Sequence, residues 1–233
     1  MSDNITTIDS IGYGSSIDQR NKVLRNTYWL LSLSMVPTIL GAWIGVATGV
    51  GAAMATMSPW IGLIVFMGGA FGFMFAIEKF KDSAAGVPIL LAFTFFMGLM
   101  LSRLVGNILG LSNGASLIMT AFAGTGGIFL GMATLSTVIK RDLSSMGKFL
   151  FIGMVMVLVA AVANIFFQST ALMIALSVLV IGISSAFILY DLKRVKDGEE
   201  TNYITATLGV YLSLYNIFSN LLALLGIFGG ERD

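Results

Sequence analysis

Long apolar runs separated by short polar connections dominate the pattern of hydrophobic and polar positions along the chain. Each run approaches or exceeds the roughly 20 residues that an α-helix needs to cross the hydrocarbon core of a bilayer. The pattern therefore predicts an all-α integral membrane protein, a bundle of seven transmembrane helices. The predicted spans are residues 27–51, 60–78, 86–110, 115–138, 149–167, 171–191 and 203–228.

The composition supports this class of protein. The chain is 57% hydrophobic and only 11% charged, with a mean hydropathy of +0.92. Soluble domains carry about 25% charged residues, so this chain could not solvate its own surface, and its predicted surroundings are a lipid bilayer. A net charge of +1 gives no case for a nucleic-acid partner.

The first 19 residues differ from the rest of the chain because they are polar and rich in Ser, Gly, Asp and Thr. They lack the apolar core of a signal peptide and have the composition of a segment without a fixed fold. We predict a flexible tail over residues 1–19 and a single transmembrane domain over residues 20–230.

Basic residues fix the predicted orientation. Eleven of the 13 Lys and Arg residues lie before the first span or in the connections that follow the second, fourth and sixth spans. By the positive-inside rule, that side is cytoplasmic. The N-terminus is therefore predicted inside and the C-terminus outside. The eleven residues are Arg20, Lys22, Arg25, Lys79, Lys81, Lys140, Arg141, Lys148, Lys193, Arg194 and Lys196.

The last span carries an unusual set of polar residues. Their spacing of four, four, three and four places them on one helical face, and polar groups in hydrocarbon usually turn toward protein or water. We predict a central C-terminal helix with this polar stripe facing inward. The stripe serves either as interhelical hydrogen-bond glue or as a permeation path. It consists of Thr205, Gly209, Ser213, Asn216 and Asn220.

Three further polar positions stand out within the apolar runs. Arg103 either snorkels to the outer interface or turns inward as a positive barrier, and Asn164 is expected to hydrogen-bond between helices. Asp191 ends the sixth span, where it is either a helix-end residue wetted by headgroups or a group facing the inside of the bundle. Glycines at four-residue spacing, Gly41, Gly45 and Gly49 and then Gly127 and Gly131, are expected to allow close helix packing within the chain.

No catalytic constellation is present in the sequence. The absence of His and Cys removes serine, zinc and thiol catalysis. The acids lie in the tail, loops and helix ends, which disfavours a two-aspartate membrane protease, and every Lys lies outside the apolar runs, which excludes a retinal Schiff base. We therefore predict a protein that is not an enzyme and has no cofactor or metal centre.

Several stretches of the chain resemble the Bax-inhibitor family, in particular its bacterial YccA branch. They are "NKVLRNTYWLLSLS" at residues 21–34, "ILYDLKRV" after the sixth span, and "ETNYITATLGVYLSLYNIFSNLLALLG" at residues 200–226. The resemblance covers residues 21–228, and the C-terminal block is its most specific part. It implies a seven-helix protein of the bacterial inner membrane.

Two activities come with this resemblance. The YccA branch is described as a substrate and modulator of FtsH, a membrane-anchored protease thought to engage the cytoplasmic N-terminal tail. Channel-like members are described as pH-sensitive calcium leaks, closed by two aspartates that share a proton. The resemblance thus implies FtsH as a partner, with calcium or other cations as the alternative.

One departure from the family pattern concerns this aspartate pair. Asp191 matches the first aspartate of the pair, but Ser213 occupies the position of the second. Closure by two aspartates that share a proton therefore cannot operate here. We expect Asp191 to accept hydrogen bonds from Ser213 or Asn216, which makes these three the candidate pH-sensing residues. Lys79 or Lys81 is the expected basic partner. The missing acid favours the FtsH interpretation over the leak.

Overall fold

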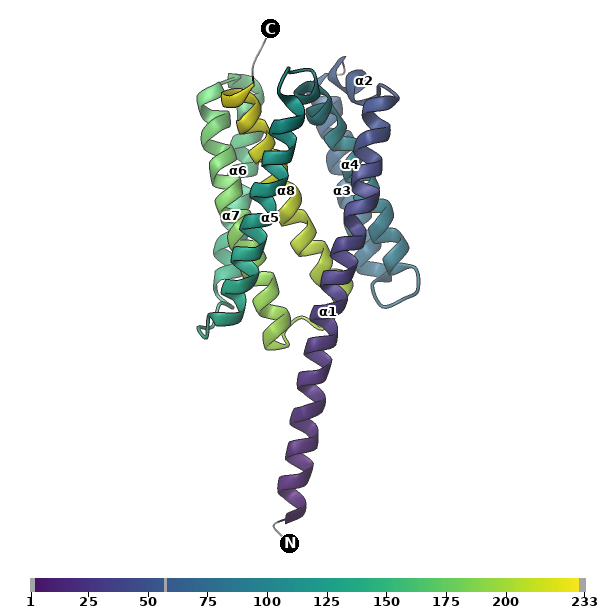
Figure 1. Ribbon diagram of the computed structural model, residues 1–233, viewed down its shortest axis with the longest axis vertical. Coiled ribbons are helices and arrows are strands. Elements are labelled where there is room, and N and C mark those ends of the chain that lie inside the picture. Colours follow the sequence, from purple (N-terminus) through teal and green to yellow (C-terminus); the bar gives the residue numbers. More distant parts are fainter. Residues whose placement is uncertain (1–2, 57, 231–233) are drawn as a thin grey trace.

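The computed structural model describes the backbone of residues 3–56 and 58–230, and side chains from residue 17 onward except at positions 55, 57 and 59. These residues form helices and no strand, and seven helices are long and apolar enough to cross a membrane (Figure 1). The predicted seven-helix fold is therefore confirmed. The helices are α1 (Asp3–Ala47), α2 (Val50–Thr56), α3 (Pro59–Phe80), α4 (Gly86–Leu109), α5 (Gly114–Val138), α6 (Met146–Phe167), α7 (Thr170–Asp197) and α8 (Tyr203–Gly229).

Two helix boundaries differ from the predicted spans for local reasons. The first span ends at Ala47 rather than near residue 51, because Gly49 adopts a left-handed conformation with φ of 75° and a short helix, α2, follows. The sixth span continues beyond residue 191 to Asp197, where Gly198 ends it at φ of 84°. Glycine reaches such φ values without steric cost and commonly terminates helices.

The N-terminal segment is helical where the sequence predicted no regular structure. α1 begins at Asp3 and extends beyond the ends of the other helices, at the end of the bundle opposite the C-terminus (Figure 1). The mobility of residues 1–19, and their separation from the transmembrane domain, stay predictions.

The C-terminal helix is central, as the polar stripe predicted. α8 packs against α1, α4, α5 and α7, and none of its side chains from Tyr203 to Gly226 is exposed. By contrast, α6 packs against α7 at the edge of the bundle, and Val157 is its one buried residue. Between Lys148 and Asn164, which lie near its ends, α6 is apolar on every face, so the faces that do not contact α7 can lie against lipid.

Close packing of α1 on α4 confirms part of the glycine prediction. A Cβ atom added to Gly41 or Gly98 would overlap the backbone of the opposite helix, and one on Gly45 would lie 2.5 Å from Ser102. Small residues of this kind allow backbones to approach where lipid provides no hydrophobic drive. Gly49 and, on α5, Gly127 and Gly131 have open space around them, so these three take no part in such a contact among the described residues.

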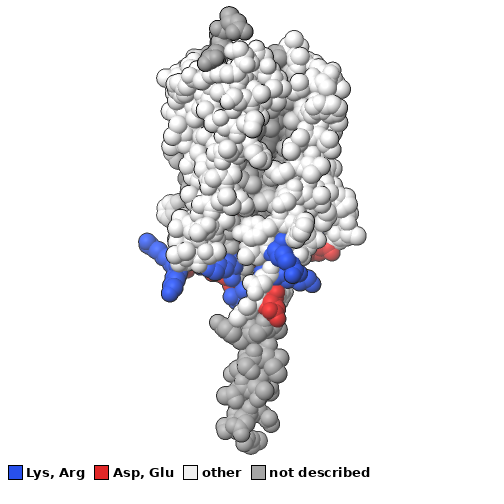
Figure 2. All heavy atoms as spheres, viewed as in Figure 1, with Lys and Arg blue, Asp and Glu red and all other residues white. Residues whose placement is uncertain are grey.

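Charged side chains are segregated along the bundle axis. Figure 2 shows that the Lys, Arg, Asp and Glu side chains visible on this face gather at the end of the bundle nearest the N-terminus, and that the described body of the bundle shows none on this face. This distribution agrees with the separation of basic and uncharged connections in the sequence.

Candidate functional site

Asp191 lies between α7 and α8, against the backbone of Gly209. A Cβ atom added to Gly209 would come within 2.7 Å of Asp191 Oδ2 and 3.2 Å of its Cγ. The carboxylate therefore packs directly on the polar stripe of α8, and the lack of a side chain at Gly209 makes room for it. Of the two alternatives for Asp191, this contact supports the one in which the carboxylate faces the inside of the bundle.

The partner of Asp191 on α8 differs by one helical turn from the expected one. No hydrogen bond joins Asp191 to Ser213 or Asn216 among the described residues; instead its carboxylate lies beside Gly209, one turn before Ser213. Ser213 is buried within the bundle, and Asn216 is partly buried. All three candidate residues therefore share one helix interface, without forming the expected hydrogen bonds.

Two hydroxyl groups at this interface are buried without a hydrogen-bond partner, at Thr205 and Ser184. Thr205 precedes Gly209 by one turn on α8, and Ser184 precedes Asp191 by about two turns on α7. A buried polar group without a partner costs about 1–3 kcal/mol, so such groups are kept where another role offsets the cost. Ser184 was not anticipated from the sequence, although it shares a face of α7 with Asp191.

Arg194 and Glu200 are the charged side chains that interact electrostatically with Asp191. Arg194 also lies 3.8 Å from Glu199 and 3.9 Å from Glu200, and its guanidinium stacks 5.5 Å from the Tyr190 ring centroid. No ion pair joins Arg194 to Asp191 among the described residues, but Arg194 lies nearer to it in the chain than the expected partners Lys79 and Lys81 do. The signal that could have identified it is its spacing of three residues from Asp191 on the same helix.

Lys79 and Lys81 make other contacts. Lys81 forms an ion pair with Glu78, and this side-chain hydrogen bond raises the pKa of Lys81. The Lys79 ammonium lies 5.6 Å from the centroid of the Phe80 ring. Neither contact involves Asp191.

Asn202 links this charged end of α7 and α8 to the connection between α3 and α4. Its Oδ1 accepts hydrogen bonds from the Ile204 and Thr205 backbone N–H groups at 2.8 and 3.2 Å, which caps α8. Its Nδ2 donates to Asp82 Oδ1 at 2.8 Å and to the Lys81 carbonyl at 3.3 Å. One amide thereby positions the start of α8, a function that the sequence analysis missed.

The remaining polar candidates lie apart from Asp191. Arg103 is exposed on α4, so its side chain does not line the interior as a barrier. Asn164 binds the backbone of Ser169, donating to its carbonyl at 3.2 Å and accepting from its N–H at 3.0 Å, and so holds the turn between α6 and α7. Asn220 donates to the Asn216 carbonyl at 2.8 Å within α8.

A second polar cluster, the Tyr211 junction (Thr38, Thr94 and Tyr211), occupies the opposite face of α8. The hydroxyl groups of Thr38 and Tyr211 lie 2.9 Å apart, and the Thr94 carbonyl accepts from Thr38 at 3.2 Å and from Tyr211 at 3.4 Å. The junction joins α1, α4 and α8, and Tyr211 is only 1% exposed. At this junction, polar groups inside the bundle do hold helices together through hydrogen bonds.

The described residues contain no group of three or more acidic, His or Cys side chains that could hold a metal ion. The interface around Asp191 offers one carboxylate, nearby hydroxyl groups and the Arg194 guanidinium. This arrangement can bind or release a proton, or attract a passing cation, within the membrane domain.

Comparison with known proteins gives a consistent relationship along almost the whole chain. Residues 20–230 match the family described as inhibitor of apoptosis-promoting Bax1. The chain is 38% identical over 219 residues to the modulator of FtsH protease YccA from Escherichia coli, covering 94% of this chain and 95% of that protein. It is also 36% identical over 223 residues to an uncharacterized protein from Neisseria meningitidis, covering 96% and 98% of the two chains.

Proposed function

This chain belongs to the Bax-inhibitor family, and on that premise we propose that it is an inner-membrane partner of the FtsH protease that modulates it and is processed by it. The observation that carries the proposal is the 38% identity, over nearly the full length of both chains, to a protein named as a modulator of that protease. The proposed activity needs binding and no bond-making chemistry.

The geometry of α1 supports this proposal. α1 extends beyond the other helices at the end where the charged side chains gather (Figures 1 and 2). By the positive-inside rule this end faces the cytoplasm, and a protease that pulls on membrane proteins needs a polar segment there. We propose that residues 2–19 are the segment that FtsH engages.

The test is the cellular half-life of a chain that lacks residues 2–19. Deletion of residues 2–19 should leave membrane insertion intact and lengthen the cellular half-life several-fold when FtsH is present, and should have no effect when FtsH is depleted. The full-length chain should also co-purify from native membranes with an inactive FtsH variant. An unchanged half-life of the correctly inserted deletion variant, together with absent co-purification, would overturn the proposal.

A second candidate function is a pH-sensitive leak for calcium or other cations. It is supported by Asp191, which lies inside the bundle against Gly209, beside an interface with two unpartnered hydroxyl groups. Ionisable residues within membrane spans commonly mark ion or proton pathways. The absence of a second acid at position 213 makes this candidate the weaker of the two.

Liposome flux separates the second candidate from the first, because a leak operates with the purified protein alone. Wild-type protein should pass calcium faster than protein-free liposomes, and Asp191→Asn should remove most of the pH dependence. Ser213→Asp should steepen it, because two nearby carboxylates resist joint ionisation. Flux equal to that of empty liposomes at every pH would exclude a leak and leave the protease proposal standing.

A further inference from the structure

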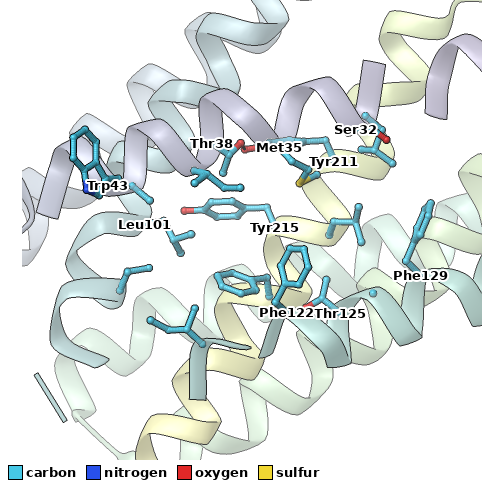
Figure 3. A pocket seen from close by; sticks show the side chains of 18 of the residues that line it. Ser32, Met35, Thr38, Trp43, Leu101, Phe122, Thr125, Phe129, Tyr211 and Tyr215 are labelled. Atoms are coloured by element: carbon cyan, nitrogen blue, oxygen red, sulfur yellow. Dashed lines mark hydrogen bonds between the residues drawn. The ribbon is translucent and has the colours of Figure 1, made fainter. Parts of the chain in front are cut away.

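A cavity of about 570 Å³ opens between α1 and α5, with α8 as its floor and α4 closing one end. Its lining is almost entirely apolar and includes no charged residue. In Figure 3 the Tyr215 ring lies across this cavity, with Thr38 on one side and Phe122 and Thr125 on the other. The cavity is separate from Asp191 and from the charged end of the bundle.

The cavity is continuous with the membrane-facing surface of the bundle. Ile39 and Trp43 form its α1 wall and are 61% and 66% exposed, while Phe122 on the α5 wall is 63% exposed. All three lie in spans apolar enough to cross the membrane. Hydrocarbon chains of lipids therefore border the opening directly, and no water-filled route is needed for them to enter.

The dimensions of the cavity identify the kind of molecule that fits. Its α1 wall runs from Leu31 to Val46, a length of about 22 Å at the helical rise per residue. A cavity of this length with an almost entirely apolar lining suits an extended hydrocarbon chain that lies along α1.

The Tyr215 hydroxyl is the polar group of the cavity that an occupant could contact. The hydroxyl groups of Ser32, Thr38, Thr125 and Tyr211 all line the cavity and have hydrogen-bond partners inside the protein. The Tyr215 hydroxyl has none in the described part of the chain. Because a hydroxyl in an apolar site is stabilised by an acceptor, this group favours an occupant that carries an oxygen atom.

We propose that the cavity binds a membrane phospholipid, which inserts one hydrocarbon chain between α1 and α5 and accepts a hydrogen bond from Tyr215 through one of its oxygen atoms. The lipid bridges two helices that flank α8, so it stabilises the bundle on the side where α1 lies.

The test is photolabelling in liposomes of phosphatidylethanolamine and phosphatidylglycerol that contain a trace of phospholipid with a diazirine on its acyl chain. Mass spectrometry should find adducts on the α8 floor of the cavity, at Leu214 and Phe218, as well as on the exposed Phe149 of α6. Labelling of Phe149 without labelling of the floor residues would overturn the proposal.

Two adjacent glycines on α5 provide a matched pair of variants. Gly126 lines the cavity and Gly127 does not, and an added Cβ atom meets no neighbour at either position. Gly126→Phe should fill the cavity and lower floor labelling at least fivefold, while Gly127→Phe should leave it within twofold of wild type. Equal labelling in the two variants would overturn the proposal. Ala42→Phe, from the α1 wall, is the second blocking variant should Gly126→Phe fail to fold.

Two further arms test the chemistry of the occupant. Tyr215→Phe should lower floor labelling about two- to tenfold, which is the equivalent of one neutral hydrogen bond, and unchanged labelling would remove the hydrogen bond from the proposal. A photoreactive residue at position 214 should capture lipid in native membranes. Capture of a protein in place of lipid would overturn the lipid assignment and identify a partner helix that covers the opening.

Discussion

The two polar faces of α8 differ in how completely their hydrogen bonds are satisfied. On the face toward α1 and α4, Tyr211 and Thr207 have partners on other helices, at Thr38 and at the Thr27 carbonyl. On the face toward α7, the Thr205 hydroxyl is buried without a partner, and the Asp191 carboxylate packs on Gly209 without a hydrogen bond from α8.

This difference separates residues that hold the bundle together from residues that are candidates for function. Both faces are polar and both lie inside the membrane domain, so polarity alone does not distinguish them. A fully bonded cluster stabilises one arrangement of the helices, whereas buried groups without partners cost stability. The α7 side of α8 is therefore where a proton, a cation or a helix movement could change the bonding pattern.

The largest expected effect comes from removing the centre of the bonded face. Tyr211→Ala should lower the free energy of unfolding in detergent by about 3–5 kcal/mol, because it deletes a fully buried aromatic ring that packs on Phe93. Tyr215→Ala, one turn further along, should cost less than half as much, because its ring lies across the cavity, where lipid or detergent can replace it, and no hydrogen bond within the described part of the chain is lost. Equal losses of unfolding free energy in the two variants, measured by denaturant titration, would contradict the assignment of Tyr211 as the centre of the bonded face.

A smaller effect is expected from crowding the other face. Gly209→Ala should destabilise the protein by about 1–2 kcal/mol, because the new methyl group would meet the Asp191 carboxylate. Gly182→Ala on α7 is the matched control, since it has open space around it and should stabilise its helix by about 0.5–1 kcal/mol.

A double-mutant cycle assigns the Gly209→Ala effect to Asp191. In an Asp191→Ala background, Gly209→Ala should be neutral or stabilising, which gives a coupling energy of at least about 1 kcal/mol. Additive effects of the two changes, measured by thermal unfolding, would mean that the carboxylate does not rest on Gly209.

The most direct comparison uses one substitution at two neighbouring positions. Thr207→Val should cost about 1 kcal/mol, since it removes a hydroxyl that donates to the Tyr203 carbonyl at 2.7 Å. Thr205→Val should be neutral or stabilising, since the hydroxyl it removes is buried without a partner. Both substitutions replace Thr by Val, so the change in helix propensity is the same in the two variants. A larger loss of stability at Thr205 than at Thr207 would show that the Thr205 hydroxyl is hydrogen-bonded in the membrane.

The sequence predicted the elements of this comparison better than their pairing. Apolar runs identified seven spans, and the spacing of Thr205, Gly209 and Ser213 identified α8 as the central helix. Periodicity specifies which residues share a face, and it does not specify how far one helix slides along another. For that reason Asp191 was expected opposite Ser213 and lies one turn away.

The Tyr211 junction could not be predicted from the local pattern. Tyr211 lies among apolar and aromatic residues, and its partner Thr38 is 173 positions away in the sequence. A signal was nevertheless present in the first span, where Thr27, Ser34 and Thr38 are spaced by seven and four residues on one face. Such a polar line indicates a helix that packs inside the bundle, although it does not name the partner.

The smallest expected effect lies outside the bundle and serves as the reference for any pH experiment on its two polar faces. Asp142, in the connection between α5 and α6, accepts a hydrogen bond from the Ser144 backbone N–H at 2.8 Å, and this bond lowers the pKa of its carboxyl group. A group with a lowered folded pKa contributes stability above its unfolded pKa and loses it as the pH falls through the folded value. Asp142→Asn should therefore melt slightly below wild type near neutral pH.

The two proteins should converge below about pH 4, the ordinary range of an aspartate. Differential scanning fluorimetry in detergent between pH 3 and pH 7 measures this convergence. Acid sensitivity that persists in Asp142→Asn and disappears in Asp191→Asn would arise at the α7 face of α8. If Asp142→Asn alone removed all acid sensitivity, the pH response would belong to the connection between α5 and α6, and the unsatisfied face of α8 would have no part in it.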